Sequence, residues 1–160
     1  MLNQIVLASK SKIRKKILEQ NKIDCIVVPS NVDEDNVKES LLKERASPEI
    51  ISKNLAELKA NKISQKRTGD MVLGADSVID LNGKIISKPI DRNEALEILK
   101  SLNGKTHYLI SSVCISLNGT MIWNYTDKAS LTMRQMSEAE LKNYLDKISD
   151  EALYLSLIHI

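Results

Sequence analysis

The amino-terminal part of the chain alternates between short apolar runs and a stretch with helical periodicity. Residues 5–8 form an apolar, partly β-branched run, which is typical of a buried strand. Apolar positions at Ile13, Ile17 and Leu18 then recur with the spacing of an amphipathic helix. Residues 25–28 form a second apolar run before a proline. Strand, helix and strand in this order predict a βαβ unit and therefore an α/β fold.

Two polar signals divide the next part of the chain. Residues 31–36 are acidic and flanked by asparagines, which predicts a turn. Ser47, Pro48 and Glu49 then supply a capping residue, a proline at the first helical position and an acid in the first turn. The apolar spacing that follows predicts a helix extending to about Lys62.

An Asn-Gly pair predicts a hairpin in the middle of the chain. Residues 71–75 and 78–81 are apolar runs that we interpret as one buried strand. Asn82 and Gly83 are the residues that a type I′ turn favours, because both of its central positions require a positive φ. Residues 84–86 then return as the second strand.

The remaining pattern predicts a helix, a longer hairpin and a last helix. The first of these helices opens at an acidic capping box and ends at an Asn-Gly pair, and the last opens at a Ser-x-x-Glu capping box. The predicted elements are a helix over 91–103, a strand over 106–117 with Leu109, Val113, Ile115 and Leu117 on one face, a turn at Asn118-Gly119, a strand over 121–133, and a helix after Ser137 with Leu141, Tyr144, Leu145 and Ile148 on one side.

The composition is that of one ordinary globular domain, at most one with two lobes. The chain has 160 residues, of which 42% are hydrophobic but only 3% aromatic, with no phenylalanine, so we expect a core of Ile, Leu and Val. A net charge of +2 gives no bulk attraction to nucleic acid or to an anionic membrane. No apolar run approaches the roughly 20 residues of a membrane span.

The cysteine and histidine content excludes several metal and disulfide classes. Cys25 and Cys114 lie far apart and form neither a disulfide framework nor a zinc pattern. Only His107 and His159 are present, so a His-rich metal site is excluded. We expect two reduced core thiols in a cytoplasmic protein, and we interpret His107 as structural.

The first candidate for chemistry follows the first predicted strand. Ser9 and Ser11 supply hydroxyls where a helix begins, and Arg14 adds a planar fork that matches a phosphate. The alternative is a serine that only caps the helix, with basic residues on a solvated face. No Walker loop or GxGxxG motif is present, so P-loop and Rossmann binding are not indicated.

The second candidate is an acid within small residues. Asp76 follows Gly74 and Ala75 at the end of an apolar run, and these small residues let another group approach the backbone. An acid in such surroundings either is partly buried, with a raised pKa, or holds a cation. The alternative is an aspartate that satisfies a turn.

Further cations and acids complete the polar set. Lys59, on the long predicted helix, and Lys88, held by a following proline, are each most simply solvated surface lysines. Glu34 lies in the acidic stretch, which either is solvated or holds Mg²⁺. Together with the two candidates above, these residues supply the cations, hydroxyls and acids that bind a polyphosphate with Mg²⁺.

Six short motifs occur in order along nearly the whole chain. They are Leu7-Ala8-Ser9-x-Ser11-x-x-Arg14 with Leu18; Val32-Asp33-Glu34; Leu55-Ala56-x-x-Lys59-Ala60; Gly74-Ala75-Asp76; Lys88-Pro89; and Leu102-x-Gly104-x-x-His107. In this order and spacing they resemble the Maf-like nucleoside triphosphate pyrophosphatases, relatives of the ITP pyrophosphatases.

The resemblance implies an elongated mixed α/β sheet flanked by helices, with two lobes around a nucleotide cleft. It also implies a hydrolase that cleaves nucleoside triphosphates between the α and β phosphates, giving a monophosphate and pyrophosphate with Mg²⁺ or Mn²⁺. Asp76 corresponds to the catalytic acid, which activates water or holds the metal, and Glu34 corresponds to a second acid near the metal. The triphosphate-binding positions correspond to Ser9, Arg14, Lys59 and Lys88.

Two departures from the family pattern bear on the base. Many members have Ser-Pro-Arg-Arg after the first strand, where this chain has Ile13 in place of the first arginine. In members resembling the dTTP- and UTP-preferring group that arginine contributes to base selection, and a threonine follows the catalytic acid, where this chain has Ser77. An apolar Ile13 suits packing against a base, so a modified guanine such as that of 7-methyl-GTP is an alternative to dTTP or UTP.

The end of the chain departs further from the family. Members continue with an Ala-Tyr-x-(Gln/Glu)-Gly segment, a strand and a helix, whereas this chain has Leu-Ser-Leu-Ile-His-Ile after Tyr154. We expect a single Maf-like domain over 1–160 that is truncated or frame-shifted after about residue 154. This leaves a second hypothesis open, a catalytically weak nucleotide-binding module of the septum-formation inhibitor type. The resemblance also implies a homodimer.

Overall fold

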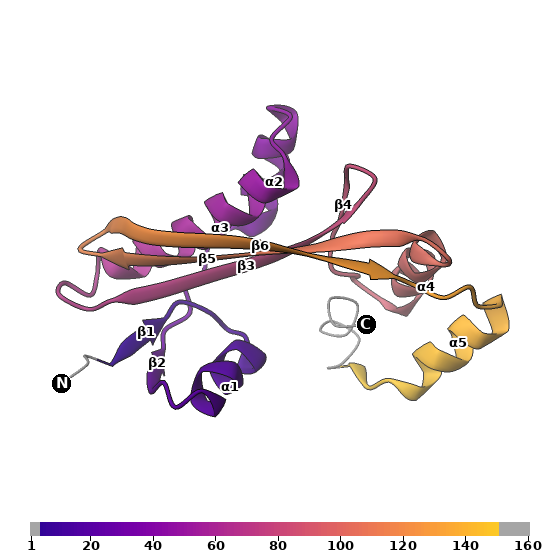
Figure 1. The fold of residues 1–160 in the computed structure, drawn as a ribbon, viewed down its shortest axis with the longest axis horizontal. Coiled ribbons are helices and arrows are strands. Elements are labelled where there is room, and N and C mark those ends of the chain that lie inside the picture. Colours follow the sequence, from indigo (N-terminus) through magenta and orange to yellow (C-terminus); the bar gives the residue numbers. More distant parts are fainter. Residues whose placement is uncertain (1–3, 151–160) are drawn as a thin grey trace. The chain divides into compact units, whose positions relative to one another are not determined.

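A computed structural model gives the fold and describes residues 4–150 (Figure 1). Within that range the chain forms five helices and six strands. In chain order they are β1 (Ile5–Leu7), α1 (Lys12–Gln20), β2 (Cys25–Val27), α2 (Glu34–Lys43), α3 (Pro48–Ser64), β3 (Val72–Leu81), β4 (Lys84–Ile86), α4 (Arg92–Leu102), β5 (Thr106–Leu117), β6 (Thr120–Thr132) and α5 (Glu138–Lys147).

The strands form one mixed sheet, which confirms the predicted α/β class. Their order is β2-β1-β3-β5-β6, and β4 pairs with β3. Strand β1 runs parallel to both of its neighbours, with Leu7 opposite Val27 of β2 and Leu73 of β3. Strands β3 and β4 are antiparallel across the predicted turn, where Asn82 and Gly83 both have a positive φ.

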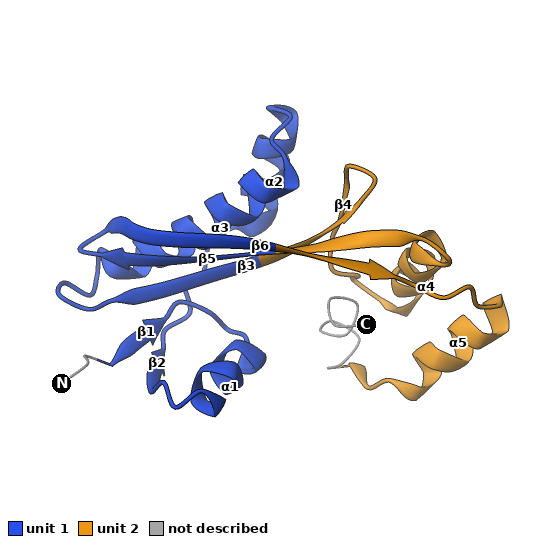
Figure 2. Ribbon diagram, viewed as in Figure 1, with its two compact units in different colours: residues 1–76, 111–127 blue, residues 77–110, 128–160 orange. Residues whose placement is uncertain are grey.

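The chain divides into two compact units (Figure 2). Unit 1 comprises residues 1–76 and 111–127, and unit 2 comprises residues 77–110 and 128–160. Helices α1, α2 and α3 belong to unit 1, and α4 and α5 belong to unit 2. The boundary falls inside β3, β5 and β6, so each of these long strands contributes residues to both units.

Helix α3 packs directly against β3 in unit 1. The helix starts as predicted, because the Ser47 Oγ accepts a hydrogen bond from the Ile50 backbone N at 3.3 Å. A Cβ added at Gly74 would collide with the Ala56 carbonyl oxygen and would lie only 2.8 Å from the Ala60 backbone N. The small residues of the Gly-Ala-Asp motif therefore admit the backbone of α3. The core beside this contact consists of Val6, Ala8, Ala56, Ala60, Ile63, Val72 and Cys114.

Two apolar clusters pack among the described residues of unit 2. One joins α4 to α5 through Ala95, Leu99, Leu141 and Leu145. The other packs the end of β3 against α4 through Ile79, Leu81 and Leu102. The predicted caps are present: Asp91 accepts from the Glu94 backbone N, and Ser137 forms a complete capping box with Glu140.

The turn predicted over residues 31–36 is wrong in its second half. Helix α2 begins at Glu34, and the Asp33 Oδ1 caps it by accepting from the Asn36 backbone N at 3.1 Å. Acidic side chains stabilise the amino-terminal end of a helix because they complement its dipole. The acidic stretch is therefore the start of a helix, and this places Glu34 in its first turn.

The more buried face of β5 is not the one that carries the larger side chains. The face with Leu109 and Val113 is only half-buried. Serine hydroxyls on the other face have partners in unit 1, since Ser112 pairs with the Thr126 hydroxyl at 2.8 Å and Ser116 donates to the Asn61 Oδ1 at 2.6 Å. That buried face consists of Ile110, Ser112, Cys114 and Ser116.

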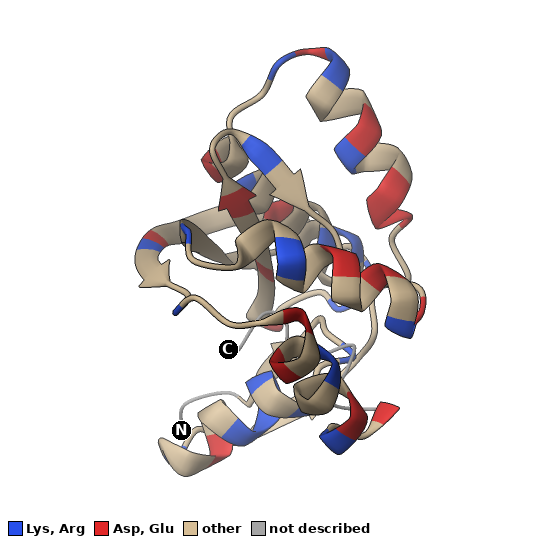
Figure 3. Ribbon diagram, turned by 90° about the vertical axis from the view of Figure 1, so that its right-hand side faces the viewer, with Lys and Arg blue, Asp and Glu red and all other residues tan. Residues whose placement is uncertain are grey.

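The remaining predictions concern the cysteines, membrane spans and the end of the chain. Cys114 is buried as expected, but Cys25 is only half-buried. Within residues 4–150 no helix is both long and apolar enough to cross a membrane. Acidic and basic residues are interspersed along the helices (Figure 3). The departure predicted after Tyr154 lies outside the described residues.

Candidate active site

The first group of predicted residues lies where β1 ends and α1 begins. The Ser11 Oγ caps α1 by accepting from the Arg14 backbone N at 3.3 Å. The Ser9 Oγ accepts from the Ser11 backbone N at 3.1 Å and from the Arg14 Nη1 at 3.3 Å. The two hydroxyls, the helix terminus and the guanidinium of the predicted anion site therefore lie together in unit 1.

Strand β3 continues past the end of β1, and its backbone then bonds to side chains. The last β1 pairing involves Leu73, whose carbonyl accepts from the Ala8 backbone N at 2.9 Å. Two residues further on, the Ala75 carbonyl accepts instead from the Arg14 Nη1 at 2.9 Å and from the Lys59 Nζ at 3.4 Å. The carboxyl ends of parallel strands are where open α/β sheets bind their ligands.

Lys59 joins two acids from different elements. It is 5% exposed on α3, and its Nζ donates to the Asp76 Oδ1 at 2.9 Å. The same nitrogen lies 2.8 Å from the Glu34 Oε1 of α2. Asp76 is 4% exposed, whereas the Glu34 side chain is 39% exposed. The ion-pair cluster is therefore closed at Asp76 and open to solvent at Glu34.

Burial sets the electrostatics of this cluster. It raises the pKa of Asp76 above its ordinary value, and the charge of Lys59 opposes part of that rise. The second oxygen of the carboxylate, Asp76 Oδ2, is buried and has no hydrogen-bond partner within residues 4–150. Burial also lowers the pKa of Arg14, and the charges of Asp76 and Glu34 oppose this effect. A buried acid with an unsatisfied oxygen beside two cations is typical of a functional site.

Ser52 also belongs to this cluster, although no predicted motif includes it. It is fully buried on α3, and its Oγ donates to the Asp76 backbone carbonyl at 3.0 Å. Ser52, Ala56 and Ala60 follow one another at intervals of four, so they form a stripe of small residues on one face of the helix. That stripe is the signal in the sequence, because a small polar residue within it faces the same strand as the alanines.

Lys88 is the predicted site residue that belongs to the other compact unit. Ser9, Arg14, Glu34, Lys59 and Asp76 all belong to unit 1, whereas Lys88 is an exposed residue of unit 2, between β4 and α4. Its place at the site stays a prediction.

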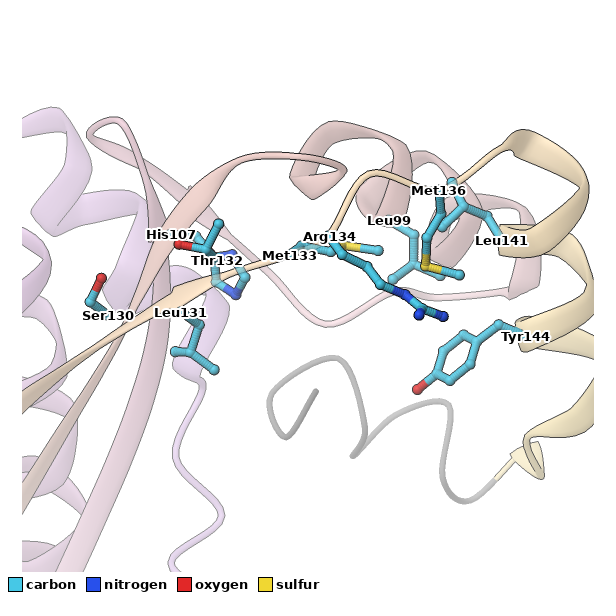
Figure 4. Close-up of a pocket in the computed structure, with 10 residues that line it drawn as sticks. All are labelled: Leu99, His107, Ser130, Leu131, Thr132, Met133, Arg134, Met136, Leu141 and Tyr144. Carbon is cyan, nitrogen blue, oxygen red and sulfur yellow. The ribbon is translucent and has the colours of Figure 1, made fainter.

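Unit 2 contains a cavity of its own, of about 430 Å³ (Figure 4). Leucine and methionine side chains provide much of its lining, together with Arg134 and Tyr144, and no acid is among the described residues that line it. His107 also lines it and is buried, so its pKa is lowered, and its Nδ1 has no partner within the described residues. This cavity lacks the combination of acids and cations found in unit 1.

The unit 1 cluster fits a metal ion that is shared with a substrate. Within residues 4–150 no three His, Cys, Asp or Glu side chains form a metal-binding group. Glu34 and Asp76 nevertheless present two carboxylates to one nitrogen, and Asp76 Oδ2 is unsatisfied. Mg²⁺ is commonly bound by one or two carboxylates together with substrate phosphates, so the donor set suits it in that form.

Fold and cluster together define a mixed α/β protein with a buried acid and two cations at the end of a parallel strand. The Maf-like protein family matches the chain over residues 4–153. The chain belongs to this family, and the resemblance seen in its motifs is confirmed.

Three curated relatives illustrate the match. The nucleoside triphosphate pyrophosphatase of Pelagibacter ubique (strain HTCC1062) is 75% identical over 154 residues, which cover 96% of this chain and 79% of that protein. The nucleoside triphosphate pyrophosphatase of Ruegeria sp. (strain TM1040) is 42% identical, covering 92% of this chain and 74% of its own. The 7-methyl-GTP pyrophosphatase of Brucella abortus biovar 1 (strain 9-941) is 34% identical, and the match covers 96% of this chain and 77% of that protein.

Proposed function

We propose that this chain is a nucleoside triphosphate pyrophosphatase, which hydrolyses the α–β phosphoanhydride to a nucleoside monophosphate and pyrophosphate. The activity named for relatives of up to 75% identity supports this enzyme over a weakly catalytic regulatory module. The observation that carries the proposal is the buried Asp76 carboxylate, with one unsatisfied oxygen, next to Lys59. Such a group supplies a proton acceptor and charge neutralisation, which in-line phosphoryl chemistry requires.

The triphosphate, in this proposal, binds at the end of β1. Ser9 accepts hydrogen bonds from Ser11 and Arg14, so its own hydroxyl hydrogen is left to donate to a phosphate oxygen. The first backbone N–H groups of α1 and the helix dipole favour the same negative charge. Arg14 and Lys59 neutralise further charge, and we propose Lys88 as an additional phosphate-binding cation.

Asp76 is the proposed proton acceptor. In the nucleotide-free protein its Oδ1 accepts from Lys59 at 2.9 Å, whereas its Oδ2 has no hydrogen-bond partner within residues 4–150. Oδ2 is therefore the oxygen that we propose to accept a proton from the attacking water. The pKa of this carboxyl is raised by burial, so the carboxylate is a stronger base than a solvated one. Ser52 holds the backbone of the same residue through the hydrogen bond to its carbonyl.

We propose Mg²⁺ or Mn²⁺ as the cofactor, with Glu34 and Asp76 as its protein ligands. When bound, the metal neutralises charge that develops on the phosphate oxygens. The contribution of the chain is the two carboxylates, one buried and one open to solvent, which are already held near each other by Lys59.

We propose that the substrate is a non-standard or modified nucleotide. Ile13 is half-buried on α1. It stands in the place of an arginine that contributes to base selection in family members resembling the dTTP- and UTP-preferring group. The 7-methyl-GTP pyrophosphatase from Brucella abortus matches this chain over 96% of its length, which supports testing a methylated guanine beside dTTP and UTP.

We also propose a homodimer that works in the cytoplasm, where nucleotides are available and free cysteines stay reduced. Strand β6 lies at the end of the strand order and exposes Ile122, Trp123 and Tyr125, the last two with stacked rings 6.4 Å apart. An exposed edge strand with apolar side chains is a ready site for pairing with a second copy. Light scattering of the wild type and of Trp123→Glu tests this, and a monomeric wild type contradicts it.

The direct test of the activity is a panel of nucleoside triphosphates with Mg²⁺ or Mn²⁺. The panel includes dTTP, UTP, GTP, ITP and 7-methyl-GTP, and both pyrophosphate and orthophosphate are assayed. We expect pyrophosphate and the monophosphate in equal amounts from one or two of these nucleotides. Orthophosphate as the first product, or thermal stabilisation by nucleotides without any product, contradicts the proposal.

A further inference from the structure

The ammonium of Lys59 has three oxygen neighbours that resemble the partial shell of a metal ion. Its Nζ lies 2.8 Å from the Glu34 Oε1, 2.9 Å from the Asp76 Oδ1 and 3.4 Å from the Ala75 carbonyl oxygen. An ammonium has three hydrogens to donate, so these contacts account for all of them. Two of the three neighbours are the carboxylates proposed above as metal ligands.

The acids around this nitrogen already have cations beside them without a metal. Glu34 and Asp76 lie near Lys59 and Arg14, and the charge of Lys38 also acts on Asp76. Lys59 and Asp76 are both buried. A divalent cation that entered beside a fixed Lys59 would face both a like charge and carboxylates that are already paired. The cation therefore binds these two carboxylates well only when the ammonium moves away.

We propose that Lys59 is an internal counterion that occupies the metal position in the metal-free protein and gives it up when the metal binds, an exchange that the triphosphate favours. This inference rests on the proposed function, since it takes Glu34 and Asp76 as the metal ligands. Lysine is suited to such an exchange because its charge sits on a flexible stem with rotatable donors. The phosphates of the substrate offer the ammonium a new partner.

Arg14 does not take part in this exchange. Its guanidinium is tied to the Ser9 Oγ and to the Ala75 carbonyl, so its bonds run to groups other than the two carboxylates. The metal and the nucleotide are consequently coupled through Lys59: the free enzyme binds the metal weakly, and the nucleotide removes the competitor.

The first experiment measures the binding of Mn²⁺ alone, without nucleotide, by electron paramagnetic resonance. Lys59→Met is compared with the wild type and with Lys66→Met, which removes the same charge from an exposed residue of unit 1. We expect Lys59→Met to bind Mn²⁺ about tenfold more tightly than the wild type, and Lys66→Met to bind it as the wild type does. Equal or weaker binding by Lys59→Met overturns the proposal.

A double variant identifies the site of that added binding. Glu34→Gln in the Lys59→Met background removes one of the two freed carboxylates, so the gain in Mn²⁺ affinity is expected to disappear. A gain that persists places the metal elsewhere and contradicts the proposal.

A second measurement uses the unmodified chain, because Lys59→Met leaves a buried carboxylate without its cation and is expected to weaken folding. Lysine acetylation is followed by mass spectrometry with and without saturating Mg²⁺, again without nucleotide. We expect Mg²⁺ to increase acetylation of Lys59 relative to Lys66, and an unchanged or lower ratio overturns the proposal. Neither measurement uses turnover. A failure of the proposal about Lys59 can therefore be told apart from a failure of the enzyme to release pyrophosphate.

Discussion

Two buried aspartates on β3 differ in what their burial achieves, and each belongs to a different unit. Asp76 in unit 1 is 4% exposed and Asp80 in unit 2 is 9% exposed. The Asp80 Oδ1 accepts from the Gly83 backbone N at 2.7 Å, so its hairpin turn explains why this acid is buried. Asp76 instead pairs with Lys59 and keeps one oxygen unsatisfied.

The same difference extends to the surroundings of the two acids. Beside Asp76, α3 presents buried Ser52 and Lys59 among alanines, whereas the strand neighbours of Asp80, Ile79 and Leu81, belong to an apolar cluster with Leu102. Unsatisfied buried polar groups reduce stability and are kept where they have a use. The comparison teaches that the partners of a buried acid, and not its burial, distinguish a reactive group from a structural one.

The largest effect is expected from Asp76→Asn. The amide keeps an oxygen that can accept from Lys59, but it can no longer take a proton from water. We expect pyrophosphate release to fall about 100- to 10,000-fold, the usual contribution of a general base. Circular dichroism is expected to show an unchanged fold.

Asp80→Asn is the matched control for that variant. It makes the same chemical change on the same strand, and its amide oxygen still accepts from Gly83. Full turnover is expected, and an equal loss in both variants would show that the two aspartates do not differ in function.

The second prediction concerns the apolar packing of unit 2. Leu102 is 1% exposed and packs with Ile79 and Leu81, so Leu102→Ala leaves a cavity there. We expect the free energy of unfolding in urea to fall by about 2–5 kcal/mol. At a temperature where the variant stays folded, kcat is expected to be retained, and a selective loss of kcat would assign unit 2 a direct catalytic part.

The third prediction concerns the contact of α3 with β3. Gly74→Ala places a methyl group against the Ala56 carbonyl, so the helix must shift. We expect a loss of about 1–3 kcal/mol in the free energy of unfolding, measured in urea. Because α3 carries Lys59, turnover is expected to fall as well, and a variant with wild-type stability and rate would contradict this close approach.

Local sequence patterns predicted the helices, strands and turns better than they predicted how these elements pack against one another. The start of α3 at Ser47-Pro48 and the turn at Asn82-Gly83 are specified by residues that are neighbours in the chain. The helical role of residues 34–36 was missed, because an acidic run favours both a turn and a helix start. The long-range packing that decides between such alternatives is not visible in a single segment.

The site shows the same limit. Motif spacing pointed to five residues that lie together in unit 1, although their chemical roles stay predictions. It did not point to Ser52, since its value to the site comes from a bond to the Asp76 carbonyl, 24 positions away. It also did not show that Lys59 pairs with both acids, because that contact depends on how α2 and α3 fold onto β3.

The fourth prediction tests Ser52 as a positioning residue. Ser52 and Ser64 are both fully buried on α3, but the Ser64 Oγ accepts from the Gly119 backbone N instead of bonding near Asp76. Each serine-to-alanine variant is expected to lose about 0.5–1.5 kcal/mol of stability. Only Ser52→Ala is expected to lower kcat with little change in KM, and Ser52→Thr is expected to restore it.

The smallest effect is expected in the titration of Asp76 in metal-free Glu34→Gln. Burial raises the pKa of Asp76, and the charge of Glu34 adds to that rise. Removing the Glu34 charge is therefore expected to lower the pKa of Asp76, which nuclear magnetic resonance of the carboxyl group measures without metal or nucleotide. An unchanged or higher pKa in the variant would contradict this contribution of Glu34.

The central claim, hydrolysis of the α–β bond by the unit 1 cluster, is tested most directly by isotope transfer from water. The wild type and Asp76→Asn are incubated with the preferred nucleotide and Mg²⁺ in H₂¹⁸O, and the masses and amounts of the products are measured by mass spectrometry. The account predicts monophosphate and pyrophosphate in equal amounts from the wild type, with one ¹⁸O atom in one of the two products. The variant is expected to form the same products about 100- to 10,000-fold more slowly. Two results would contradict it. One is a nucleoside diphosphate with labelled orthophosphate, and the other is formation of the labelled monophosphate or pyrophosphate by Asp76→Asn at the wild-type rate.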